Sequence, residues 1–124
     1  MKTANEIKKA VKEKYGEIAQ GKSSCCGETS SCCGSSVIRL TQGYDDNEVN
    51  ALPEDSDLGL GCGFPTRSAK FETGQTVLDL GSGAGVDCFL AAKAVGPDGK
   101  VMGIDMTDEM IEKARDNAKQ KGFT

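Results

Sequence analysis

Apolar residues near the start of the chain have the spacing of one helical face. They recur every three or four positions, at Ile7, Val11, Tyr15 and Ile18. Thr3 and Glu6 have the spacing of a capping box, in which each side chain accepts the backbone N–H of the other residue. We expect an amphipathic helix that docks through its apolar stripe and keeps its lysines in solvent. A basic helix that binds an acidic partner is the alternative.

The helical pattern ends in residues 21–36, which consist mostly of glycine, serine and cysteine and show no apolar period. Such a composition buries no core, so we expect residues 21–43 to be mobile. We also expect residues 1–75 to pack poorly, because the chain has only two strands of a sheet that needs a third. The acidic residues 44–57 have room for one short helix. A glycine-dense loop, LGLGCGFP, follows over residues 58–65.

Strands and helices alternate from residue 76 onward. Residues 76–80, TVLDL, form a short apolar run typical of a buried parallel strand, and residues 100–105, KVMGID, form a second. The helix after the first strand ends at Gly96 and Pro97, and the helix after the second begins at Thr107. Right-handed crossovers make the two strands parallel.

This order predicts an α/β, Rossmann-like fold that is cut off after its first β-α-β-α unit. Residues 76–124 form the first part of that domain, and residues 1–75 form an extension with the helix, the cysteine-rich segment and the glycine-dense loop. Two strands and two helices bury little area for a parallel sheet, which needs helices on both faces. We therefore expect the chain to be the N-terminal piece of a longer protein.

Composition and charge narrow the function. Apolar residues make up 37% of the chain, the N-terminus is charged throughout, and no run approaches the roughly 20 apolar residues of a membrane span. With 15 basic and 19 acidic residues, the net charge of −4 argues against nucleic acid as the main partner. We expect a cytoplasmic protein that binds neither membrane nor nucleic acid.

The reactive side chains are cysteines. Histidine is absent, which excludes a histidine base or metal ligand in this chain, whereas there are six cysteines. In a reducing cytosol such cysteines are metal-binding, catalytic or redox-active more often than they are disulfide-bonded.

The loop after the first predicted strand carries the clearest chemistry. Gly81, Gly83 and Gly85 allow a tight turn and let a ligand approach without meeting a Cβ atom, and helix amides follow them. Asp105 ends the second strand, where a carboxylate can accept both hydroxyls of a ribose. We expect a nucleoside-containing cofactor; a plain glycine turn is the alternative.

The details of this loop favour one nucleoside. GSGAG lacks the GxxG ending of the NAD motif, which disfavours NAD without eliminating it. VLDLGSGAG and GIDMT resemble the first and second motifs of class I S-adenosylmethionine-dependent methyltransferases. The resemblance implies that the first loop passes around the methionine moiety through Asp79, Gly81, Ser82, Gly83 and Gly85. It also implies that Asp105 holds the ribose and that Met106 lies against the adenine.

Nearly the entire chain resembles the arsenite S-adenosylmethionine methyltransferases. The resemblance rests on KYGEIA, the paired cysteines, LPEDSDLGLGCGFP, VLDLGSGAGVDCFLAA and GIDMTDEMI. It implies a cytoplasmic enzyme of arsenic detoxification, with arsenite or its thiol conjugates as substrate and a small-molecule thiol as reductant. Trivalent arsenic prefers soft thiolate ligands, and its lone pair can attack the sulfonium methyl without a histidine base. We expect the full-length enzyme to be a monomer.

The same resemblance assigns the cysteines. Cys62 matches a catalytic cysteine that binds arsenic, and Cys25 and Cys26 match a pair that gathers the metalloid. Cys32 and Cys33 form a second pair, which the family does not uniformly show. The family's other arsenic-binding cysteines lie beyond residue 124, so we expect the isolated chain to be inactive.

Alternatives remain for every cysteine. Cys62 could be a small loop residue, and the two cysteine pairs could hold zinc as a four-thiolate site or serve a redox role. Cys88 is predicted to be a small core residue with a protonated thiol. A second function class is therefore a methyltransferase of a small organic acceptor, quinone-like or sterol-like, with a separate metal-binding or redox segment.

Overall fold

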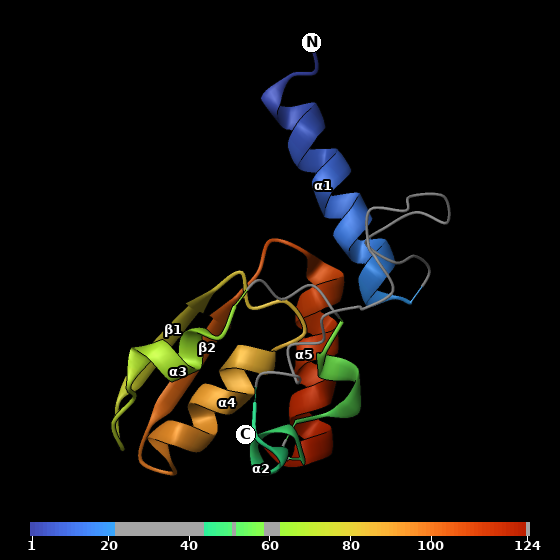
Figure 1. The fold of residues 1–124 in the computed structure, drawn as a ribbon. Helices are drawn as coiled ribbons and strands as arrows, with labels where there is room; N and C mark the ends of the chain where they lie inside the picture. The colour runs from blue at the N-terminus through green and yellow to red at the C-terminus, as the bar shows by residue number, and fades with distance from the viewer. Residues whose placement is uncertain (22–43, 51, 59–62, 124) are drawn as a thin grey trace.

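A strand, a connecting loop and a helix occur twice in succession in the C-terminal half of the chain, and the first of these loops is rich in glycine (Figure 1). The computed structural model describes residues 1–21, 44–50, 52–58 and 63–123. Their elements are, in order, α1 (Ala4–Ala19), α2 (Asp46–Asn50), the 3-10 helix η2 (Glu54–Ser56), α3 (Pro65–Ala69), β1 (Thr76–Leu80), α4 (Val86–Val95), β2 (Lys100–Ile104) and α5 (Asp108–Lys121). The expected Rossmann-like β-α-β-α unit is confirmed.

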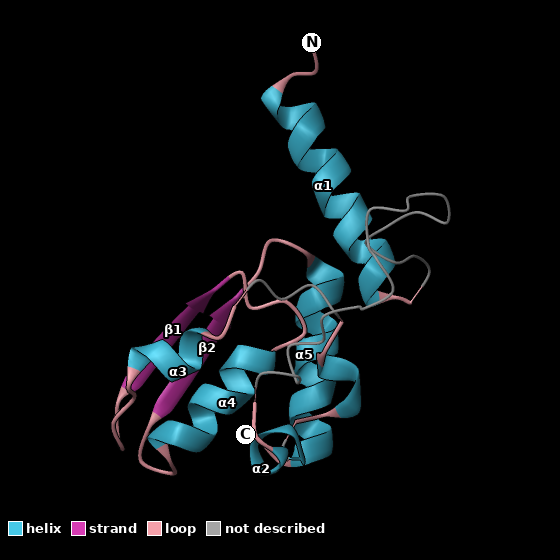
Figure 2. Ribbon diagram, viewed as in Figure 1, coloured by secondary structure: helices cyan, strands magenta, loops and turns pink. Residues whose placement is uncertain are grey.

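The two strands pair in parallel, as their crossover predicts. Thr76 is opposite Lys100, and the register continues to Leu80 opposite Ile104. Helices α4 and α5 lie to one side of this sheet (Figure 2). Both strands therefore end at the same edge, where the loops into α4 and α5 meet.

The expectation that both strands are buried is wrong for one face of the sheet. Leu78 is 52% exposed and Leu80 is 74% exposed, and Met102 and Ile104 on β2 are exposed as well. Successive side chains point to opposite faces of a strand, and α4 packs on the sheet from one side. The covered face is therefore that of Val77, Asp79, Val101 and Gly103.

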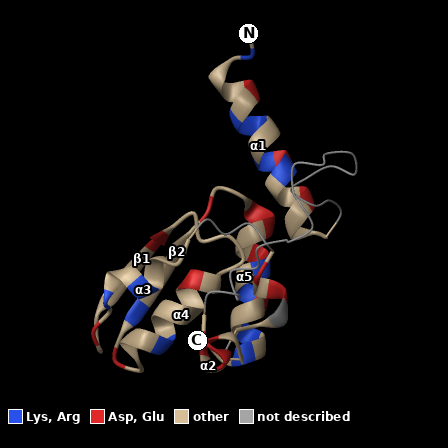
Figure 3. Ribbon diagram, viewed as in Figure 1, with Lys and Arg blue, Asp and Glu red and all other residues tan. Residues whose placement is uncertain are grey.

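Helix α1 begins with the predicted capping box. The Thr3 side chain accepts the Glu6 amide at 3.3 Å, and the Glu6 carboxylate accepts the Thr3 amide at 2.6 Å. Docking of the whole apolar stripe is wrong: Ile7 is 51% exposed, and only the helix end at Gly16, Ile18 and Ala19 is buried. The first turns project away from the other elements, with lysines and glutamates along their sides (Figure 3).

The core lies around α4. One cluster of its buried residues consists of Tyr44, Leu52, Val86, Phe89 and Leu90. Two aromatic pairs extend it: Phe64 meets Tyr44 edge-on at a ring distance of 5.2 Å, and Phe123 lies 5.1 Å from Phe89. Poor packing of residues 1–75 is therefore wrong for Tyr44 and Leu52, which the acidic stretch contributes to the core. The predicted mobility of residues 21–43 falls almost entirely on residues outside the described ones.

None of the helices in the described part of the chain is long and apolar enough to cross a membrane.

Candidate functional site

The glycine loop between β1 and α4 turns sharply across the end of β2. The Gly81 and Ser82 amides both donate to the Ile104 carbonyl, at 2.7 and 3.0 Å. Gly85 has a φ of +99°, and a Cβ atom there would lie 2.9 Å from the Phe89 ring. Glycine is thus required at this position by both the backbone conformation and the packing.

A second glycine, Gly103 on β2, allows this close crossing and was not singled out from the sequence. A Cβ atom at Gly103 would lie 2.7 Å from Ser82 Oγ and 2.8 Å from Cys88 Sγ. An isolated glycine inside a strand often marks a close approach, so the signal was present in KVMGID.

Asp105 ties the two loops together. Its Oδ2 accepts the Gly83 amide at 3.0 Å, and its Oδ1 accepts the Thr107 amide at 2.8 Å. An ionised carboxylate has about four acceptor positions, so lone pairs remain for hydroxyl groups of a ligand. The residue predicted to bind a ribose therefore also holds the glycine loop.

A cavity of about 980 Å³ opens at this edge of the sheet. This is the size of a small-molecule or cofactor site, and the carboxyl ends of parallel strands are where α/β proteins place such sites. Five predicted cofactor residues line it: Gly81, Ser82, Gly83, Asp105 and Met106. Asp79 and Gly85, also predicted, are not among the residues lining it.

Asp79 lies beneath α4 instead, next to Cys88. The Cys88 thiol donates to Asp79 Oδ2 at 3.3 Å. Burial, together with the charge of Asp79 and this hydrogen bond, raises the pKa of the Cys88 thiol to about 12. The thiol is therefore protonated at neutral pH, as predicted. Its hydrogen bond gives the Asp79 carboxylate a partner on the side of the sheet that α4 covers.

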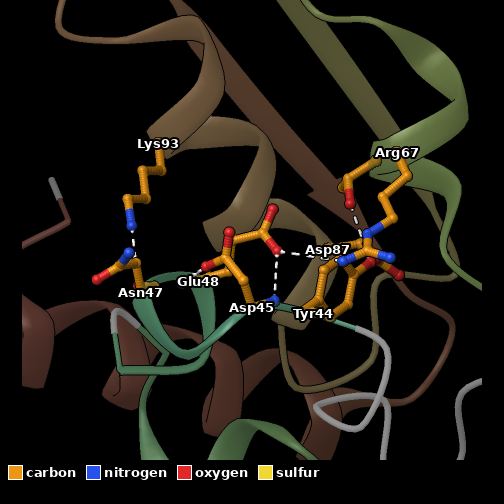
Figure 4. A network of polar contacts seen from close by, with 8 residues as sticks. Tyr44, Asp45, Asn47, Glu48, Arg67, Asp87 and Lys93 are labelled. Carbon is orange, nitrogen blue, oxygen red and sulfur yellow. Dashed lines mark hydrogen bonds and ion pairs between the residues drawn. The ribbon is translucent and has the colours of Figure 1, made fainter.

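A network around Tyr44 reaches the cavity through one member and was missed in the sequence (Figure 4). The Tyr44 hydroxyl lies 2.9 Å from Thr66 Oγ1 and donates to Asp87 Oδ1 at 3.3 Å. The Arg67 guanidinium lies over the Tyr44 ring, 5.6 Å from its centroid, and approaches Glu48 at 3.8 Å. These contacts join α2, α3 and α4, which are separate in the sequence.

Asp87 is the member of this network that lines the cavity. Burial raises the pKa of its carboxyl, and the nearby charge of Asp79 raises it further, whereas the Tyr44 hydrogen bond lowers it. It is the second residue of α4, directly after the glycine loop. An acidic residue in the first turn of a helix that follows such a loop was the available signal.

The predicted arsenic ligands Cys25, Cys26, Cys32, Cys33 and Cys62 lie outside the described residues. Leu58 and Gly63, which flank residues 59–62, both line the cavity. Within the described ranges, no group of three or more histidine, cysteine or acidic residues is arranged to hold a metal ion.

Comparisons with known proteins find similarity to methyltransferases, as the glycine loop and the acidic residue after β2 predict. The family model described as "Methyltransferase domain" matches residues 71–124. The arsenite methyltransferase of Halobacterium salinarum is 49% identical to the chain over 124 residues, covering 90% of this chain and 31% of that protein. Those of Aquipseudomonas alcaligenes and Mus musculus are 37% and 35% identical, over 82% and 90% of this chain.

The chain thus spans between 28% and 31% of the length of these relatives. No solved structure matches it.

Proposed function

The chain is a homologue of part of the arsenite methyltransferases, and from that premise we propose that the protein containing it methylates trivalent arsenic with S-adenosylmethionine. The carrying observation is a single cavity that joins the glycine loop, Asp105 and Gly63. The first two are the expected cofactor groups, and Gly63 directly follows the proposed arsenic ligand, Cys62.

The cofactor assignment rests on the edge of the sheet. Asp105 accepts two backbone amides and keeps lone pairs for the ribose hydroxyls. Met106 is 57% exposed beside it, which leaves its side chain free to lie against an adenine. When bound, S-adenosylmethionine supplies an electrophilic methyl group on its sulfonium sulfur.

The substrate assignment rests on thiolates. Cys62 would hold arsenic as a soft ligand, and Cys25, Cys26, Cys32 and Cys33 would gather or transfer it. Methyl transfer would form an As–C bond from the arsenic lone pair as the S–C bond of the sulfonium breaks. It would formally raise arsenic to the pentavalent state and would remove no proton, so no base would be required. This agrees with a chain that contains no histidine. A small-molecule thiol would then return arsenic to the trivalent state by two-electron reduction, as two thiols become a disulfide. We propose that the full-length enzyme is a cytoplasmic monomer.

Two carboxylates give the cavity a negative field. Asp105 and Asp87 both line it. Carboxylates attract a cationic ligand most strongly where water is partly excluded. We propose that this field favours the positively charged sulfonium form of the cofactor over its neutral demethylated product.

Cysteine substitutions in the full-length enzyme test the proposal. Cys62→Ser should abolish transfer of labelled methyl to arsenite and leave S-adenosylmethionine affinity within about twofold, since the cofactor residues are unchanged. Cys88→Ala is the matched control: its thiol is protonated and bonded to Asp79, so methylation should persist. Methylation at the wild-type rate by Cys62→Ser would overturn the arsenic assignment and favour a methyltransferase of an organic acceptor.

A further inference from the structure

Two exposed residues on the apolar face of α1 line the same cavity as the glycine loop. Val11 is 36% exposed and Tyr15 is 40% exposed. Both line the cavity together with residues 81–83, Asp105 and Met106. Ile7, one turn earlier on the same stripe, does not line it.

Helix α1 is fastened beside the ribose-binding position. Lys12 Nζ lies 2.9 Å from Asp108 Oδ2, and Asp108 is the first residue of α5, three positions after Asp105. Gly16 faces Glu109 so closely that a Cβ atom there would lie 3.0 Å from Glu109 Cδ. Contacts on both sides of Tyr15 therefore hold α1 against the start of α5.

Side chains of α1 consequently face the part of the cavity next to Asp105 and Met106. Tyrosine combines a large apolar ring with a hydroxyl that can reach solvent or a polar group. A ring of this kind, left partly exposed beside a nucleoside site, gains burial only when a flat apolar ligand is present.

We infer that α1 is a wall of the cofactor site, with Tyr15 and Val11 covering the nucleoside part of S-adenosylmethionine. This inference rests on the proposed function, because it takes the cavity to be the cofactor site. It explains why the stripe of α1 is apolar although three of its four residues are exposed among the described residues. It also gives the N-terminal helix a role in cofactor affinity, separate from the cysteines that follow it.

Calorimetric titration of the full-length protein with S-adenosylmethionine tests the inference. Tyr15→Ala should weaken binding about tenfold, as expected for loss of one large buried contact, and Val11→Ala should weaken it less. Tyr15→Phe should retain most of the affinity because the ring is kept. The matched control is Ile7→Ala, which shortens the same stripe outside the cavity and should bind like the wild type.

Amide hydrogen exchange gives a second readout that does not depend on activity. Adding S-adenosylmethionine should slow exchange in residues 9–16 of the wild type, and much less in Tyr15→Ala. If the wild type binds S-adenosylmethionine and Tyr15→Ala binds it with the same affinity, the inference is overturned and the proposed function is unaffected. Equal losses in Ile7→Ala and Tyr15→Ala would also overturn it, because the effect would then come from the helix as a whole. Failure of the wild type to bind S-adenosylmethionine would overturn the proposed function and the inference together.

Discussion

Helices α1 and α5 have similar sequence patterns and different surroundings. Each begins after a threonine N-cap, carries an acidic residue in its first turn and has an apolar stripe. In α5 the stripe includes Met110, which is 1% exposed, whereas three of the four stripe residues in α1 remain exposed. The comparison teaches that a helical period identifies a face but not what covers that face.

The difference follows from what lies next to each helix. Helix α5 follows β2 directly, and its buried Asn117 donates to the Ala84 carbonyl in the glycine loop at 3.1 Å. Helix α1 contacts the body through its last turns, and its polar anchor, Lys12 with Asp108, is exposed to solvent. We infer that other segments of the protein cover the apolar face of α5, whereas a bound ligand completes the cover of the apolar face of α1.

The largest expected effect is on stability, when one apolar residue of the stripe is replaced by alanine in each helix. Met110→Ala should lower the free energy of unfolding by about 2–5 kcal/mol, because the Met110 side chain is 1% exposed and its truncation removes buried apolar contacts at the border of the cavity. Ile7→Ala on α1 should change it by less than about 0.5 kcal/mol, as is usual for an exposed site. Urea unfolding of both variants measures the contrast, and equal losses would contradict it.

Much of the β-α-β-α unit could be predicted because its signals are local. A short apolar run, a glycine loop and an acid at the end of the next strand follow one another in a fixed order within residues 76–105, and parallel pairing of the two strands brings them together in space. Asp105 was therefore found, and its hydrogen bond to Gly83 confirms that the two loops meet.

The rest of the site could not be predicted because it is assembled from distant segments. Tyr44 reaches Asp87 across 43 positions, and Lys12 reaches Asp108 across 96. No period or motif encodes such contacts. The exposed stripe of α1 was misinterpreted for the same reason, since a face that lines a cavity has the same spacing as one that packs on protein.

A buried amide tests how α5 is held to the loop. Asn117→Ala removes the donor to the Ala84 carbonyl, and the unpaired carbonyl should cost about 1–3 kcal/mol of stability. The change should appear as a lower unfolding midpoint together with faster amide exchange at residues 83–89. An unchanged midpoint would mean that α5 is held by its apolar residues alone.

The N-caps offer a smaller contrast. Thr3 makes the capping box of α1, so Thr3→Ala should cost about 1 kcal/mol of local helix stability. Faster amide exchange in residues 5–8 measures this loss. Because the first turns of α1 are exposed and project away from the other described elements, the global unfolding midpoint should stay unchanged; a clear drop would show that they are packed after all.

The smallest effect is expected at the exposed ion pair. The hydrogen bond between Lys12 and Asp108 raises the pKa of Lys12, so the lysine stays charged through neutral pH. Lys12→Met should therefore leave the unfolding midpoint unchanged within error, because solvent screens such pairs. Cofactor affinity should fall slightly at low salt and match the wild type at high salt, which a salt series of titrations measures. A salt-independent loss would contradict an electrostatic anchor.

The central claim is that the cavity at the ends of β1 and β2 binds S-adenosylmethionine through Asp105. Titration of the full-length protein with this ligand tests it most directly, with Asp105→Ala compared against Asp116→Ala. The control removes an exposed acid of α5 that pairs with Lys119, away from the cavity. Asp105→Ala should weaken binding by about 1–3 kcal/mol, roughly 5- to 150-fold, while the control binds like the wild type. Unchanged affinity in Asp105→Ala, with the variant folded, would contradict the account.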